Sequence, residues 1–433
     1  MGTTADKLNA VLASKNAIKA AISEKTGGDA GDVMSTYAEQ IRNISSGGGG
    51  GIVSKPSKDV NFYDYDGTIL YSYTIDEAKA LTDLPAGPQH EGLTFDGWNY
   101  TLDEIKLEDE MCDVGAMYVT DDGKTRLYIT TYIDAFDVSL AYYQTNANGA
   151  TVNWGDGTTT TNSAAGNVLI THEYATAGDY IITIEVTAGT INLGRSNSSY
   201  NVMGSIGNVY RAGIATLRKV EIGANVKSFT GYCFYYCVNL ETIAIPRVMT
   251  EVANYCFGYD YSLKHVNIPR VANLGTYVCS NAFALKSVSL APTISTLGNY
   301  CFDSCSALSR LNIPNKVTSI ATYVARYTRA LIRLSLSPNI ADIGTYSFSQ
   351  CYSLTKFKAP ANLTSIKANA FNGCYCIMEY DFTECTVVPT LAATSAFTNT
   401  HSSSKFLVPA SLVDEWKAAT YWSTYATRIV GVE

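Results

Sequence analysis

The sequence predicts a multidomain, mainly β protein whose second half is a β-solenoid. A six-residue phrase, apolar-x-x-apolar-x-apolar and usually followed by proline, returns every 22 or 23 residues. One such unit is too small to bury its apolar side alone, so a row of them indicates stacked coils. Only 16% of the 433 residues are charged and 31 are tyrosine, which suits a rigid β-rich protein better than a helical enzyme. The phrase begins at Leu217, Leu240, Leu263, Leu285, Leu308, Leu331, Leu354 and Ile377.

Residues 1–45 are predicted to form a helical attachment or oligomerisation segment. Leu8, Leu12, Ile18 and Ile22 recur at helical spacing and give a narrow apolar stripe. A glycine-rich linker at 46–58 follows. A helical unit of this size is not stable alone, so we expect it to dock on a partner or to form a homo-oligomer, most simply a trimer. Residues 7–22 and 37–41 also resemble the N-termini of tail-fibre proteins of phages that infect gut bacteria, where they imply attachment to other virion proteins.

Two small β modules are expected next. Residues 59–110 contain an alternating run, a turn at Asp66-Gly67 and the phrase Gly-Leu-Thr-Phe-Asp-Gly-Trp at 92–98. This stretch resembles the β-grasp-like modules of internalin-type repeats and implies no chemistry. Residues 113–190 carry Trp-Gly-Asp-Gly at 154–157 and an alternating strand after His172, and they resemble a PKD domain, an immunoglobulin-like sandwich. That resemblance implies that Asp156 and His172 form hydrogen bonds in a turn and a strand and do not form a metal or acid–base site.

The solenoid is expected over residues 200–385, and a cap over 386–433. Between the strand phrases lies a second half-repeat, such as Ile-x-x-Leu-x-x-Tyr-Cys-Phe-x-x-Cys at 294–305. These units resemble the BspA-type leucine-rich repeat, although tyrosine often precedes the position that is usually Ala. The segment from Phe406 through Trp416 and Trp422 resembles the strand–helix cap that protects the open edge of such an array.

The 11 cysteines are mostly explained by the repeat. Eight of them fall in two repeat phases, Cys233, Cys256, Cys279 and Cys301 in one and Cys237, Cys305, Cys351 and Cys374 in the other. Neighbours in a column stand within disulfide reach, but buried cysteine also packs as a small apolar residue. The other members of the columns are Val, Ser, Ala, Asp and Thr, which favours a reduced packing ladder over a metal or redox site.

The net charge of −8 conceals a split along the chain. Residues 217–382 hold 15 basic and 8 acidic side chains, whereas residues 61–110 hold 2 basic and 12 acidic ones. In the strand phrase the second, third and fifth positions are expected to face solvent, which predicts a basic stripe. The stripe keeps the sheet soluble or binds an anionic glycan or surface polymer, with exposed turn tyrosines as sugar-stacking platforms. Its residues are Arg218, Lys219, Lys264, His265, Lys286, Arg310, Arg333, Lys356 and Lys358, and the platforms are Tyr235, Tyr236, Tyr259 and Tyr327.

No catalytic constellation is found in the sequence. The four histidines lie in four different segments, and no phosphate-binding loop, nucleophile elbow or zinc spacing occurs. We therefore expect no enzyme, no cofactor, no metal, no nucleic acid and no membrane insertion. The leading hypothesis is a phage virion fibre that uses its solenoid to contact a host-surface glycan or protein. The alternatives are a BspA-like adhesin at the bacterial surface and a binding module associated with an enzyme.

Overall fold

A computed structural model of the protein describes residues 58–195, 200–205 and 216–433. All of these belong to one unit, Ser57–Glu433. The predicted N-terminal segment, with Leu8, Leu12, Ile18 and Ile22, lies outside the described residues, and so does all of the linker except its last residue.

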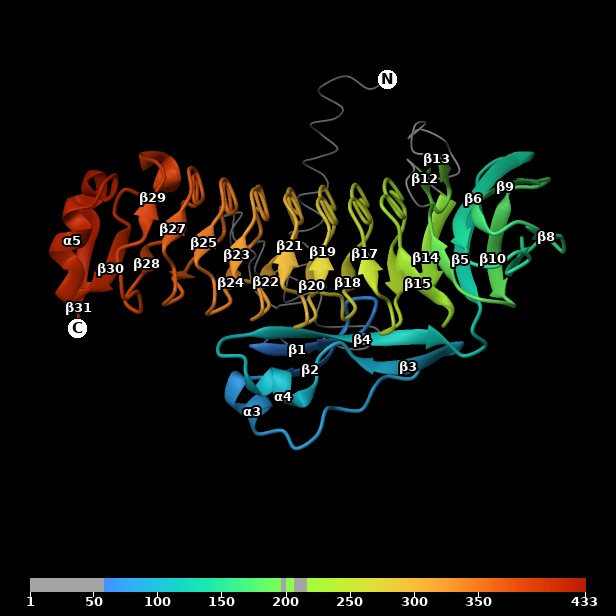
Figure 1. The fold of residues 1–433 in the computed structure, drawn as a ribbon, viewed down its shortest axis with the longest axis horizontal. Coiled ribbons are helices and arrows are strands. Elements are labelled where there is room, and N and C mark those ends of the chain that lie inside the picture. The colour runs from blue at the N-terminus through green and yellow to red at the C-terminus, as the bar shows by residue number, and fades with distance from the viewer. Residues whose placement is uncertain (1–57, 196–199, 206–215) are drawn as a thin grey trace, which may run out of the picture. The chain divides into compact units, whose positions relative to one another are not determined.

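The repeats form coils that each contribute one short strand to each of two faces (Figure 1). Strands on a face pair in parallel at a register of one repeat, as Arg310 with Arg333 and Asp342 with Ser365. The first face, the strand face, contains β14 (Leu217–Glu221), β16 (Thr242–Ala244), β18 (His265–Asn267), β20 (Ser287–Ser289), β22 (Arg310–Asn312), β24 (Arg333–Ser335), β26 (Phe357–Lys358) and β28 (Glu379–Asp381). The second face contains β15 (Val226–Phe229), β17 (Glu251–Val252), β19 (Asn273–Leu274), β21 (Thr296–Leu297), β23 (Ser319–Ile320), β25 (Asp342–Ile343), β27 (Ser365–Ile366) and β29 (Thr390–Leu391).

The core of the solenoid lies between these two faces. The apolar positions of the phrase point inward as predicted, since Leu240, Ile243 and Ile245 are all buried. Phenylalanines add a second inner layer, in which Phe234 and Phe257 stack at 5.5 Å between ring centroids. Burial of this continuous core is the main stabilising contribution, because no single coil could form it.

A two-sheet sandwich precedes the solenoid and is continuous with it. Its strand β5 pairs with β14 in one sheet, and its strand β11 pairs with β15 in the other. The sandwich therefore covers the edges that the first coil would otherwise expose. Its strands are β5 (Thr125–Thr131), β6 (Phe136–Gln144), β7 (Ala150–Asn153), β8 (Thr159–Thr161), β9 (Gly166–Tyr174), β10 (Gly178–Val186) and β11 (Ile191–Leu193), and a short ribbon, β12 (Tyr200–Asn201) with β13 (Gly204–Ser205), follows.

The groups considered for a site in the sandwich serve its packing. Buried Trp154 stacks on His172 with ring centroids 4.7 Å apart. The His172 Nε2 lies 2.6 Å from Asp156 Oδ2, and the Tyr174 hydroxyl donates to the Trp154 carbonyl at 2.7 Å. These contacts tie the Trp-Gly-Asp-Gly turn to β9, which is the hydrogen-bonding role expected for them.

Residues 58–120 form a separate four-stranded sheet, which we call the sheet module. Its order is β2-β1-β4-β3, with β1 and β4 parallel and the other pairs antiparallel. Residues from 113 onward were expected to begin the sandwich, but that boundary is wrong because β4 lies in the middle of this sheet. The elements are β1 (Val60–Tyr63), β2 (Ile69–Tyr73), α3 (Ile75–Lys79), β3 (Leu93–Trp98), α4 (Leu102–Lys106) and β4 (Cys112–Thr120).

A cap of mixed structure follows the last coil. Trp416 and Trp422 are fully buried against Phe382 and Phe406, and the Trp422 indole donates to the Pro389 carbonyl at 2.6 Å. The elements are η3 (Thr394–Phe397), β30 (Lys405–Pro409), η4 (Ala410–Leu412), α5 (Val413–Ala418), η5 (Trp422–Arg428) and β31 (Ile429–Val432). In the part of the chain that the structure describes, no helix has the length and apolar character needed to span a bilayer.

Candidate binding surfaces of the solenoid

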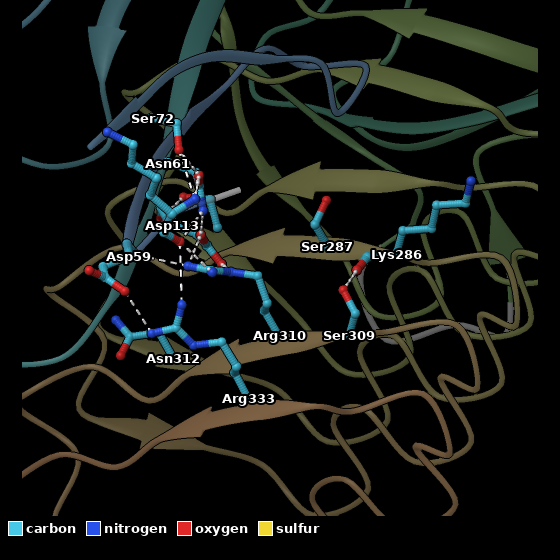
Figure 2. A network of polar contacts seen from close by, with 12 residues as sticks. Asp59, Asn61, Ser72, Asp113, Lys286, Ser287, Ser309, Arg310, Asn312 and Arg333 are labelled. Carbon is cyan, nitrogen blue, oxygen red and sulfur yellow. Dashed lines mark hydrogen bonds and ion pairs between the residues drawn. The ribbon is translucent and has the colours of Figure 1, made fainter. Parts of the chain in front are cut away.

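Arg310 on β22 makes the central contact between the strand face and the sheet module. Its Nη2 lies 3.1 Å from Asp113 Oδ1 of β4, and both side chains are buried. The same guanidinium donates to the carbonyls of Lys58 at 2.6 Å and Asp59 at 2.8 Å, so it reaches β4 and the residues before β1 together (Figure 2). A buried charge is tolerated only when it is paired and hydrogen-bonded in this way.

Other strand-face residues hold the same module at several further points. Arg333 forms an ion pair with Asp59 at 2.9 Å. Arg270 donates from Nη1 and Nη2 to the two carboxylate oxygens of Glu104, at 2.7 and 2.8 Å. The charge split in the sequence is therefore partly satisfied within the chain, because an acidic module lies on a basic sheet.

His265 joins the interface as an uncharged residue. Its ring stacks on Tyr63 with centroids 4.8 Å apart and lies within 2.6 Å of both Ser287 Oγ and Asn267 Oδ1. Burial lowers the pKa of His265, so it is neutral at pH 7. Asn99 completes the contact by donating to the Ile268 carbonyl at 3.0 Å.

The predicted solvent-facing basic stripe is wrong as a single surface. His265 and Arg310 are buried beneath the sheet module, because β1 and β4 occupy the face that the repeat pattern assigns to solvent. Lys219 pairs with Glu221 at 2.7 Å, and Arg218 donates to Thr130 of the sandwich at 2.8 Å.

The remaining cations of the stripe stay at the surface but do not form a basic patch. Lys264 lies 3.6 Å from Glu241, and Lys286 points away from the Arg310 cluster (Figure 2). Lys356 is exposed, and Lys358 pairs with Glu384 at 2.8 Å. The groove of about 990 Å³ beside Lys356 and Lys358 is also lined by Glu110, Glu379 and Asp381, so its charge is mixed.

The turns between the two faces carry a continuous ladder of aromatic rings. Tyr232 stacks on Tyr255 at 4.5 Å, and each following pair repeats the contact at 4.4 to 5.0 Å with nearly parallel rings. These tyrosines all have positive φ, between 54° and 65°, a conformation that non-glycine residues rarely adopt. The ladder contains Tyr232, Tyr255, Tyr277, Tyr300, Tyr323 and Tyr346. We call these turns, residues 232–238 and their equivalents in later coils, the turn ridge.

The structure brings three of the four predicted platforms together on this ridge. Tyr236 stacks on Tyr259 at 4.5 Å, and Tyr235 meets both rings edge-on. Tyr327 stands three coils further along, where Arg326 lies 4.9 Å from its ring centroid.

An outer column of the turn ridge was not predicted from the sequence. Tyr261 and Phe283 stack at 5.3 Å and are 39% and 45% exposed, and Tyr352 stacks on Tyr375 at 5.5 Å. These rings lie one position after the residues of the second cysteine phase and recur at multiples of the 22- or 23-residue repeat. This spacing was the signal in the sequence that could have revealed the column. Partly exposed rings that stack from one coil to the next suit recognition of flat ligands.

The eight cysteines of the two repeat phases form buried packing columns, as predicted. None of the 11 is in a disulfide, and only Cys376 is exposed. In the second column the Sγ of Cys305 donates to the Cys279 carbonyl at 3.0 Å, and Cys351 and Cys374 repeat this contact. No group of three or more potential metal ligands occurs among the described residues.

Asp260 occupies the same column as these cysteines. It is fully buried, and neither carboxyl oxygen has a hydrogen-bond partner. The nearby Cys237 backbone N–H already donates to the Phe234 carbonyl at 3.0 Å. Burial raises the pKa of Asp260 well above its ordinary value, which favours the protonated carboxyl in the folded chain.

Comparison with known proteins places the repeats in a family but leaves the other parts undefined. A family model described as "BspA type Leucine rich repeat region" matches in six copies, over residues 197–308 and 272–404. No curated protein matches the chain. Residues 197–404 are therefore BspA-type leucine-rich repeats, and the PKD-like and β-grasp-like assignments stay predictions.

Several solved structures are similar to parts of the chain. A leucine rich cell surface protein of Faecalibacterium prausnitzii is 23% identical, with a TM-score of 0.32 over 45% of this chain and 60% of that one. A leucine-rich repeat protein of T. pallidum is 24% identical, with a TM-score of 0.28 over 30% and 62%. One from Eubacterium ventriosum is 20% identical, with a TM-score of 0.30 over 41% and 57%. The matched part thus spans about three fifths of the length of these relatives.

Proposed function

We propose that this chain, whose residues 197–404 are BspA-type leucine-rich repeats, is a non-enzymatic adhesive protein of a bacterial surface. Its ligand would be a glycan or protein on a host or mucosal surface, contacted by the turn ridge. The observation that supports this most directly is the row of stacked and partly exposed rings that runs from coil to coil along the ridge. Aromatic side chains offer large contact area with little loss of side-chain entropy, so such rows serve recognition well.

The turn ridge is favoured over the strand face because the strand face is already occupied. The sheet module buries Arg310 and His265 and pairs with Arg270 and Arg333, which removes much of the charge that an anionic ligand would need. The ridge has no comparable cover within the described part of the chain.

A second candidate is the virion fibre, attached to other virion proteins and made as a trimer. It is favoured by one observation, the resemblance of residues 7–22 and 37–41 to phage tail-fibre N-termini. Those residues lie outside the described part of the chain, and the resemblance is the whole support for this candidate. Fractionation of native material separates the two: a virion fibre travels with particles at fixed stoichiometry, whereas an adhesin remains with cell envelopes.

The binding surface can be tested with two double variants in the same pair of coils. Tyr261→Ser with Phe283→Ser removes exposed rings of the turn ridge, and Lys264→Ser with Lys286→Ser removes exposed cations of the predicted stripe. Adhesion of the full chain to immobilised mucin and to epithelial cells is measured after equal melting temperatures are verified. We expect the ring variant to lose adhesion and the lysine variant to keep it. If the lysine variant loses adhesion and the ring variant keeps it, the ligand binds the strand face instead. If the native chain itself does not adhere, the proposed function is wrong.

A further inference from the structure

One coil of the turn ridge departs from the pattern of its neighbours and leaves a hollow. The outer column contains Tyr261, Phe283, Arg329, Tyr352 and Tyr375, but the coil between Phe283 and Arg329 places Ser306 there. In the next column the same coil places Ser304, between Asn281 and Tyr327 of the adjacent coils. Two serines side by side on the ridge leave a space of about 230 Å³.

The lining of this hollow is chemically asymmetric. Phe283 and Tyr327 supply aromatic surface, and Ser304 and Ser306 also line the hollow. Arg329 lies at one wall with its guanidinium 5.9 Å from the Tyr327 ring centroid and 5.7 Å from that of Tyr352. The five residues Phe283, Ser304, Ser306, Tyr327 and Arg329 define what we call the Ser306 hollow.

Arg329 is the cation at this hollow that is available to a ligand. Neighbouring Arg326 is engaged with Asp303 through two bonds, at 2.8 and 3.1 Å. Arg329 is an exposed residue, and among the described residues no carboxylate forms an ion pair with it. A planar guanidinium held against aromatic rings is prepared for a carboxylate, which it can bind with two parallel hydrogen bonds.

These features indicate one class of ligand. Aromatic walls stack against the C–H face of a sugar ring, and serine hydroxyls can donate to and accept from its hydroxyl groups. Pockets for drug-sized molecules measure about 300–1,000 Å³, so this hollow suits a single ring. We infer that the Ser306 hollow binds one acidic monosaccharide unit of a surface glycan, a sugar ring that carries a carboxylate. This inference rests on the proposed adhesive function and assigns it a ligand chemistry.

The experiment uses the full chain and three free sugars, which are glucuronic acid, N-acetylneuraminic acid and neutral glucose. Saturation-transfer NMR detects weak contacts, and titration gives relative affinities. We expect at least one acidic sugar to bind about tenfold more tightly than glucose, through the charge-assisted bond to Arg329. The two acidic sugars also distinguish a uronic acid from a sialic acid as the source of the carboxylate.

Ser306→Tyr is the decisive variant, because tyrosine already occupies this column at Tyr261, Tyr352 and Tyr375 and should fill the hollow without disturbing the coil. We expect it to abolish binding of the acidic sugar. Arg329→Gln should reduce binding of the acidic sugar about tenfold and leave glucose unchanged, whereas the exposed cation variant Lys316→Gln should change neither.

Three outcomes would overturn the inference. They are unchanged binding by Ser306→Tyr, equal binding of glucose and the acidic sugars by the native chain, and no sugar binding at all. If adhesion to mucin still depends on Tyr261 and Phe283 in those cases, the adhesive function stands and only the ligand assignment fails. If native adhesion itself is absent, both fail.

Discussion

Arg310 and Asp113 lie 197 residues apart in the sequence and form a buried ion pair, with Nη2 3.1 Å from Oδ1. Arg310→Met leaves the Asp113 carboxylate buried with Asn61 as its remaining side-chain partner, at 3.2 Å. Removing one member of a buried pair costs about 3–5 kcal/mol, and we expect the free energy of unfolding to fall by that order. Chemical denaturation measures this change in the free energy of unfolding.

Lys356→Met is the matched control for this prediction, because Lys356 is an exposed cation on the same face. It should change stability by less than about 0.5 kcal/mol. Adding Asp113→Asn to Arg310→Met should recover part of the loss, since the uncompensated charge is gone. Equal stability of the two methionine variants would show that the ion pair does not hold the sheet module.

Glu108 makes the stability of the chain depend on pH. Burial raises its pKa to about 8, the charge of Asp109 adds to the shift, and a hydrogen bond from Asn312 opposes it. The folded state therefore keeps a proton that the unfolded state releases near pH 4, so this contribution to stability falls as pH rises from about 4 to 8. The slope is at most about 1.4 kcal/mol per pH unit.

Glu108→Gln should remove this slope and make the chain more stable than the native protein at pH 8 and above. Denaturant midpoints at pH 5, 7 and 9 measure the effect. Glu110→Gln changes an exposed carboxylate two residues away and should leave the slope in place. An undiminished slope in Glu108→Gln would assign the pH dependence to other groups.

Asp260 is expected to lower the stability of the second cysteine column at neutral pH. Thr328 in the same column donates its hydroxyl to the Phe302 carbonyl at 3.2 Å, as the cysteines do with their thiols. An ionised carboxylate has no hydrogen to give, and burial raises the pKa of Asp260. Its contribution to stability is therefore largest below pH 4 and decreases as pH rises above the ordinary pKa of aspartate.

Asp260→Asn supplies a donor of the same shape and should raise the melting temperature at pH 7 while having little effect at pH 4. Asp342→Asn removes a carboxylate that is only partly buried and lies 3.7 Å from Lys367, and it should not stabilise the chain. A lower melting temperature of Asp260→Asn at pH 7 would mean that the charged carboxylate has a stabilising partner in the folded chain.

The tyrosine ladder should contribute measurably to solenoid stability. Tyr300 stacks on Tyr277 at 4.4 Å and on Tyr323 at 4.5 Å. Asn369 holds the equivalent position of a later coil with φ of 58°, so asparagine suits this backbone. Each aromatic pair is worth about 0.5–1.5 kcal/mol, so Tyr300→Asn should destabilise by about 1–3 kcal/mol.

The reciprocal change, Asn369→Tyr, should add one ring beside Tyr346 and stabilise the chain by about 0.5–1.5 kcal/mol. Thermal unfolding of Tyr300→Asn and Asn369→Tyr measures both changes in stability. If both variants are destabilised, strain at the left-handed position outweighs stacking, and the ladder is not a source of stability.

The repeat carried enough information to predict the solenoid from sequence alone. A period of 22 or 23 residues placed Leu240, Ile243 and Ile245 inside, and it grouped the cysteines into buried columns. These features depend on local pattern, because each coil contacts its neighbours in the same way. The cap tryptophans, Trp416 and Trp422, were recognised for a similar reason, since the end of a stack requires apolar cover.

The strand-face interface could not be predicted from that pattern. The phrase assigns Arg310 and His265 to the outside of the solenoid, and only a contact with residues 58–120 decides whether the outside is solvent. The opposite charges of the two segments were the available signal. Read as complementarity within one chain, they would have suggested pairs such as Arg270 with Glu104 and Arg333 with Asp59.

The sheet module also restricts how this protein can change in length over evolution. Its contacts to Arg270, Arg310 and Arg333 lie on three different coils of the array, with successive coils about 4.8 Å apart. Duplication or loss of a coil between these arginines would move at least one of them away from its partner. Coils added beyond Lys358 would meet no such constraint. Length variation among close relatives should therefore be concentrated toward the C-terminal end of the array, where each new coil also extends the turn ridge.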